Sequence, residues 1–248
     1  MAAFAEYAAL VLTTGITVFV VLTPLQYREG ISGRRWSRPV STASYVSPVY
    51  RALFVVDLEN STANSDLVKG RMRRVLYRLL DEALRLSEVR PEDRDRLVDR
   101  GDGVLVLIKP TDRLPTPNLF TVLIPTFERL VAQHNKNSPD RPVRLRMAVH
   151  AGEVHHDEHG PFGEAVDLAC RLLDSSELKA ALKCADASTV LAVSQYLYEA
   201  IIRHEYDDID ATRYSPLIRV ELVGKTREGW LRTDLSTRHP DIMGLHST

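Results

Sequence analysis

Apolar residues along this chain follow two periods, and polar turns separate the segments. Residues 51–58 form an apolar run that carries Asp57 near its end, which indicates a central strand buried on both faces. Residues 68–86 and 119–134 place apolar side chains at helical spacing, whereas residues 143–150 alternate apolar and polar positions like a half-buried strand. The first half of the chain is therefore predicted to mix strands and helices.

The second half continues this mixture with shorter segments. Two apolar stretches flank Gly101-Asp102-Gly103, which predicts a hairpin with its turn at the glycines. The remaining predicted elements are a helix over about 164–182, a strand over 189–193, a helix over 195–203 capped by Ser194, and a closing hairpin over 217–223 and 229–232. The order βαββαβ, then αββ, predicts an α+β domain over residues 51–233, with a mostly antiparallel sheet and helices on one face.

The two ends of the chain differ from this domain. The segment from Tyr7 to Tyr27 has no charged residue and is mostly apolar, so residues 1–27 are long enough for a transmembrane helix. The arginines that follow favour a cytoplasmic location for the downstream domain, anchored to the cell membrane. The alternative is a soluble packing helix or an artefactual extension. Residues 28–50 are predicted to be a linker, and residues 234–248 a flexible tail.

Composition and charge exclude several functions. The content of 44% hydrophobic and 26% charged residues is that of a globular protein. A formal net charge of −1 and a pI near 6.7 give no overall basic field, so nucleic acid is not an expected partner. Cys170 and Cys184 lack metal-ligand spacing and are interpreted as reduced thiols.

Two aspartates carry the strongest chemical signal. Asp57 ends an apolar strand, and Asp102 lies in a glycine-rich turn. A buried aspartate is costly unless its charge is paired, and two converging carboxylates can bind one hard cation through oxygen ligands. The alternative is structural, with Asp57 capping its turn and Asp102 serving an ordinary β-turn.

A third segment completes a recognisable pattern. It consists of Arg144-Leu145-Arg146-Met147-Ala148-Val149-His150-Ala151-Gly152 and, later, Gly163-Glu164-Ala165-Val166-Asp167-Leu168-Ala169-Cys170-Arg171. In this order, the three segments resemble the catalytic domain of class III nucleotidyl cyclases over residues 51–232. The resemblance implies a ferredoxin-like βαββαβ core. It also implies two Mg²⁺ or Mn²⁺ ions per site, held by Asp57, Asp102 and the backbone carbonyl of Leu58.

The resemblance also assigns roles to two cationic residues. Arg171 falls where the family places an arginine that stabilises the transition state, since a guanidinium can contact two phosphoryl oxygens at once. Lys225 lies where some members keep a triphosphate-binding lysine. In the family, the metal carboxylates of one subunit meet the arginine of the other, which implies a homodimer. The structural alternatives are a helix-surface arginine in a salt bridge and an ordinary turn lysine.

Three positions depart from the family pattern. Asp167 replaces the asparagine that positions the ribose, Val98 replaces the lysine of adenine-specific members, and Gly160 stands where a base-reading Asp or Thr is expected. A pocket that reads adenine depends on such groups. The chain is therefore a poor candidate for a conventional adenylyl cyclase, and it is similar in this respect to bacterial pyrimidine cyclases of antiviral defence.

Two functions follow from these observations. The first is an enzyme that converts a nucleoside triphosphate into a 3′,5′-cyclic nucleotide and pyrophosphate, in a signalling role and with non-standard base specificity. The second is a catalytically inactive cyclase-homology domain that serves as a nucleotide-binding, dimerisation or regulatory module. Retention of Asp57, Asp102 and Arg171 favours the enzyme, whereas the three departures favour the module.

Overall fold

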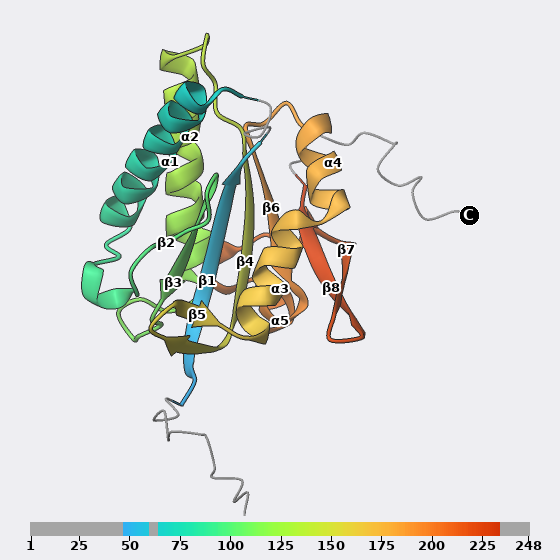
Figure 1. The fold of residues 1–248 in the computed structure, drawn as a ribbon. Coiled ribbons are helices and arrows are strands. Elements are labelled where there is room, and N and C mark those ends of the chain that lie inside the picture. Colours follow the sequence, from blue (N-terminus) through green and yellow to red (C-terminus); the bar gives the residue numbers. More distant parts are fainter. Residues whose placement is uncertain (1–46, 60–63, 234–248) are drawn as a thin grey trace, which may run out of the picture. The chain divides into compact units, whose positions relative to one another are not determined.

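The computed structural model describes residues 47–59 and 64–233, and Figure 1 shows how their elements are arranged. The predicted transmembrane helix (1–27), most of the predicted linker and the predicted tail lie outside these residues. Within the described part, no helix combines the length and apolar character needed to cross a bilayer. The longer elements, in chain order, are β1 (Val49–Leu58), α1 (Asp66–Leu86), β2 (Val98–Asp99), β3 (Gly103–Ile108), α2 (Ile124–Asn137), β4 (Leu145–Asp157), β5 (Gly160–Phe162), α3 (Glu164–Asp174), α4 (Ser176–Cys184), β6 (Thr189–Ser194), α5 (Gln195–Ala200), β7 (Tyr214–Leu222) and β8 (Lys225–Arg232).

Short helical turns fill the connections. A π-helical turn, η4 (Leu119–Leu123), runs directly into α2, and single 3₁₀ turns occur at η3 (Pro91–Asp93), η5 (Ile202–His204), η6 (Tyr206–Asp208) and η7 (Ala211–Arg213). Pro91 begins η3, because its ring fixes φ and it has no N–H to leave unsatisfied.

One mixed sheet forms the centre of the domain. Its strand order is β2-β3-β1-β4-β6-β8-β7, and β5 pairs with the far end of β4. Neighbouring strands are antiparallel except β4 and β6, which are parallel and are joined by the α3–α4 crossover. The predicted α+β class with a mostly antiparallel sheet is confirmed.

Helices cover both faces of the sheet (Figure 1), so the prediction of helices on one face is wrong. In β1, Phe54 and Val56 join the core beneath α1 and α2, while Leu53 and Val55 join the core beneath α3 and α4. Because successive side chains point to opposite faces, an uninterrupted apolar strand needs a cover on each side.

The predicted helix over 164–182 is two helices. It breaks at Ser175, whose backbone is extended and whose hydroxyl accepts a hydrogen bond from the Leu178 N–H to cap α4. A serine cap of this kind satisfies one of the free N–H groups that begin a helix. The break lets α4 pack Leu178 and Leu182 against the sheet at a new angle.

Candidate active site

Close backbone contact brings the two predicted metal aspartates together. In the sheet, Asp57 lies opposite Gly103, and the N–H of Leu58 donates to the carbonyl of Asp102 at 3.1 Å. A Cβ on Gly103 would lie 2.5 Å from the Val56 carbonyl and 3.2 Å from Cβ of Asp57. Only glycine fits this approach, and it places the turn that carries Asp102 beside Asp57.

The Asp57 carboxylate is buried and half-satisfied. The residue is 8% exposed, and its Oδ2 accepts a hydrogen bond of 2.6 Å from Nη2 of Arg146 on β4. Its Oδ1 is buried and has no hydrogen-bond partner among the described residues. Burial raises the pKa of Asp57 to about 6; the Arg146 charge opposes this rise, and the Asp102 charge adds to it. A buried anion in this state is stabilised by a second cation.

These residues fit a divalent cation in donor chemistry and in position. Carboxylate and carbonyl oxygens are the ligands that Mg²⁺ and Mn²⁺ prefer, and Mg²⁺ is usually held by one or two carboxylates together with substrate phosphates. Within the described ranges, no group of three or more His, Cys, Asp or Glu side chains is placed to hold a metal ion. Asp57 and Asp102 are therefore the described carboxylates that could contribute to a divalent-cation site.

Helix α3 presents Arg171 and Asp167 on its exposed side, one turn apart. The opposite side of α3 packs Ala169 and Leu172 against the sheet. The Arg171 side chain makes no hydrogen bond or ion pair with any other described residue. Arg171 is thus not held against the aspartates of its own chain, and it is free to contact a ligand or a second copy.

The end of α3 lies near the aspartate pair. The charge of Asp174, the last residue of α3, contributes to the raised pKa of Asp57. Burial also raises the pKa of the Cys170 thiol, and the nearby Arg100 guanidinium of the β2–β3 turn opposes that rise. Helix α3 and the β2–β3 turn are therefore neighbours within one chain.

The residues predicted to contact the base and the triphosphate are divided between opposite ends of the sheet. Val98 pairs with Leu105 in the strand next to β1, and it is half-buried against the core beneath α3. Gly160 pairs with Asp157, at the end of β4 remote from Arg146. Lys225 is exposed at the start of β8. The pairing of β4 with β6 and of β6 with β8 places the opposite end of β8 at the edge of the sheet where Asp57 lies. One chain alone does not bring Gly160 and Lys225 to the aspartates.

Arg146 is the site residue that sequence reasoning missed. Its side chain is 14% exposed, and its Nε is buried without a hydrogen-bond partner in the described part of the chain. The sequence shows it only as a polar position of an alternating strand. Its importance depends on the register that sets it opposite Asp57.

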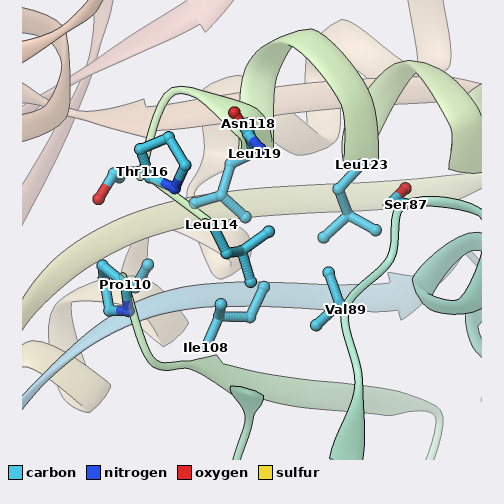
Figure 2. Close-up of a pocket in the computed structure, with 11 residues that line it drawn as sticks. Ser87, Val89, Ile108, Pro110, Leu114, Thr116, Asn118, Leu119 and Leu123 are labelled. Atoms are coloured by element: carbon cyan, nitrogen blue, oxygen red, sulfur yellow. The ribbon is translucent and has the colours of Figure 1, made fainter. Parts of the chain in front are cut away.

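A separate apolar cavity is too small to be the site. Its lining includes Ala52 and several leucines, and Figure 2 shows the side chains of Ile108, Leu114, Leu119 and Leu123 pointing toward one another in this space. Its volume is about 10 Å³, at the lower limit for a single water molecule. No nucleotide fits there, so this cavity is not the candidate site.

The fold and this edge together define a class of protein: the domain has the fold of class III adenylate and guanylate cyclase catalytic domains. No protein-family model matches the sequence, and no curated protein matches it. The assignment of the fold therefore comes from solved structures.

Three of these structures illustrate the likeness. An adenylate/guanylate cyclase/hydrolase from Silicibacter pomeroyi superposes with a TM-score of 0.54 at 15% identity, covering 77% of this chain and 99% of that one. The guanylyl cyclase Cya2 gives 0.51 at 13% identity, covering 75% and 93%. A bacterial light-regulated adenylyl cyclase gives 0.52 at 14% identity, covering 83% of this chain and 59% of that one. At such identities, the likeness establishes the fold.

Proposed function

We propose that this protein is a nucleotidyl cyclase that converts a nucleoside triphosphate into a 3′,5′-cyclic nucleotide and pyrophosphate. The 3′-oxygen attacks the α-phosphorus, the bond from that phosphorus to the bridging oxygen breaks, and pyrophosphate leaves with the electron pair. The 3′-hydroxyl proton passes to solvent. One observation carries the proposal: the buried Oδ1 of Asp57 lies beside the turn of Asp102 and has no hydrogen-bond partner among residues 47–59 and 64–233.

The residues at this edge match the needs of the reaction. Asp57, Asp102 and the Leu58 carbonyl would hold two Mg²⁺ or Mn²⁺ ions, which assist loss of the 3′ proton and neutralise phosphoryl charge. Arg146 would exchange its bond to Asp57 for the triphosphate once cations neutralise that carboxylate, and its buried Nε offers a further donor. A solved cyclase core with a TM-score of 0.50 and 14% identity is described in complex with ATPαS, which supports a triphosphate ligand.

A second copy of the chain supplies the missing cation in this proposal. Arg171 is exposed and unpaired within the described residues, and it would reach the transition-state phosphoryl group from the partner subunit. The remote positions of Lys225 and Gly160 support the same two-fold arrangement. The domain would work in the cytoplasm, anchored by residues 1–27.

The base would not be adenine. Val98 and Gly160 offer no side-chain hydrogen bond to a base edge, and Asp167 adds an acceptor where the ribose would lie. A pyrimidine is the preferred candidate. A cyclic pyrimidine nucleotide would suit a signalling role in antiviral defence.

The test is incubation of the full chain with Mn²⁺ and each of the four NTPs, followed by mass spectrometry of the products. We expect one cyclic nucleotide to form, and Asp57→Asn and Asp102→Asn each to abolish it. Asp66→Asn is the matched control, because Asp66 is fully exposed at the start of α1 and should leave the product unchanged.

Mixing variants tests the shared site. Asp57→Asn and Arg171→Ala are each expected to be inactive, but a heterodimer of the two has one intact site. After subunit exchange, an equal mixture should recover roughly a quarter of wild-type activity if one site works independently of the other. Absence of recovery would place Arg171 on the same chain as its aspartates and contradict the dimeric arrangement.

A second candidate function is a silent cyclase-homology module that binds nucleotide without turnover. The observation that favours it is the Arg146–Asp57 ion pair, which already partly neutralises the carboxylate a metal would need. Under this reading, NTPs bind to the full chain but none yields a cyclic product with Mn²⁺ or Mg²⁺.

A further inference from the structure

A large groove lies between α1, the end of α2 and the ends of β1 and β4. It runs between the first turns of α1, the end of α2 and residues 138–144, and its volume is about 780 Å³. Small-molecule sites usually measure about 300–1,000 Å³, so the groove is large enough for an organic ligand. Figure 1 shows α1 and α2 side by side on one face of the sheet.

Arginines dominate the charge of this groove. Five arginines and two acids line it, which gives a net charge of +3. The acid Glu59 is already paired with Arg144 at 2.9 Å, and Asp140 is exposed at the rim. Such an excess is unusual in a chain whose acidic and basic residues nearly balance.

Four of these arginines are unpaired among the residues that the structure describes. The side chains of Arg71, Arg74, Arg78 and Arg141 make no hydrogen bond or ion pair within residues 47–59 and 64–233. Elsewhere on α1, by contrast, Arg85 is paired with Glu82 at 2.6 Å. The unpaired arginines of α1 are three and four residues apart, so they share one side of the helix.

The groove also has an apolar floor. Met72, Val75 and Val143 line it beneath the arginines, and Val143 is buried in the core. His134 adds a polar group, and burial together with the nearby Arg78 charge lowers the pKa of its imidazole. A neutral imidazole at pH 7 can both donate and accept a hydrogen bond.

The groove is distinct from the candidate active site. Leu58 and Val56 of β1 face the core beneath α1 and α2, whereas Asp57 alternates to the opposite face with Val55. The α1 arginines of the groove therefore lie over the other face of the sheet from the carboxylate of Asp57, while Glu59 and Arg144 border the groove at the strand ends.

We propose that this groove binds a small ligand carrying at least two phosphate groups, of the nucleoside diphosphate class. Guanidinium groups recognise phosphate oxygens in pairs, and four of them match a diphosphate. The apolar floor suits a base or sugar face next to the phosphates. Nucleic acid fits less well, because the chain as a whole has a net charge of −1 and the positive charge is confined to a pocket.

Calorimetry with the full chain in EDTA tests the site. Without divalent cations, the negative charges of Asp57 and Asp102 repel phosphate groups. Binding of a phosphate-containing probe in EDTA therefore measures the groove. ADP and inorganic pyrophosphate are the probes. We expect ADP to bind more tightly than pyrophosphate, because only ADP contacts the apolar floor. Arg74→Ala/Arg78→Ala should weaken ADP binding at least tenfold, and the control Arg85→Ala should change it less than twofold.

Three outcomes would overturn the proposal: no binding of ADP in EDTA, equal binding by Arg74→Ala/Arg78→Ala and the wild type, or binding of a single-stranded oligonucleotide without binding of ADP. Asp57→Asn should bind ADP in EDTA like the wild type. The groove can therefore be refuted while the cyclase proposal stands, and the reverse also holds.

Discussion

Gly103→Ala tests the contact on which the aspartate pair depends. The φ angle of Gly103 is not in the left-handed region, so an alanine meets no backbone strain and the whole effect comes from space. The added methyl carbon would lie 2.5 Å from the Val56 carbonyl and within 3.3 Å of two atoms of Asp57. Backbone atoms in the middle of a sheet cannot move aside as a flexible side chain can.

The expected cost follows from two opposing effects. Overpacking of a well-packed interior costs about 1–3 kcal/mol, and alanine returns about 0.4–1 kcal/mol by restricting the unfolded chain. Because the methyl meets backbone atoms, the upper part of this cost applies, and the free energy of unfolding should fall by about 1–2 kcal/mol, which lowers the Tm by about 2–8 °C for a domain of this size. Because the turn must move away from β1, the proposed cyclase activity should fall by about 100-fold, as misplacement by 1 Å can cause.

Thermal unfolding and product formation measure these two effects. Gly70→Ala is the matched control, since its new Cβ would have only Arg74 Nη1 near it, at 3.9 Å, and it lies inside α1. There, alanine should raise stability by about 0.5–1 kcal/mol. A Tm of Gly103→Ala within 1 °C of the wild-type Tm would contradict the close contact between this turn and Asp57.

Three further predictions concern stability and reactivity. Burial lowers the pKa of His150 to about 4, so the native imidazole stays neutral while that of the unfolded chain takes up a proton below about pH 6.5. The contribution of His150 to stability is therefore present above pH 6.5 and is lost as the pH falls to 4. Between these two pH values, the free energy of unfolding measured in urea should depend less on pH in His150→Gln than in the wild type. Arg144→Ala removes the bond to half-buried Glu59 and the bonds to the Leu182 and Ala185 carbonyls, and should lower the free energy of unfolding by about 2–3 kcal/mol, whereas an unchanged urea midpoint would contradict these contacts. Exposed Cys184 should react with a thiol reagent at least about tenfold faster than Cys170, whose pKa is raised by burial, and Cys184→Ser should leave only the slow phase.

Much of this fold is predictable because its strands and turns carry local signals. The apolar run before Asp57 and the glycines around Asp102 place both residues at strand ends without knowledge of the fold. The same apolar run predicts burial on both faces, and this observation already contradicts a sheet covered by helices on one side only. The break at Ser175 is hidden, because apolar spacing continues through it and the cap is a single hydroxyl.

Strand register limits what sequence can show of the site. Arg146 and Asp57 are 89 residues apart, and only the pairing of β1 with β4 makes them neighbours. The arginine groove cannot be predicted from the sequence either. Arg141 lies in a loop far from α1 in sequence, and no local pattern shows whether an exposed arginine on a helix is paired.

The two rims of the sheet have a consequence for association between chains. One outer strand, β2, has two residues, and the other, β7, is interrupted by a bulge between Ser215 and Ile218 that contains the exposed Pro216. Exposed Arg219 and Glu221 follow along β7. Short, kinked and charged rims are poor templates for strand addition, so this sheet resists fibril-like growth at both of its outer strands.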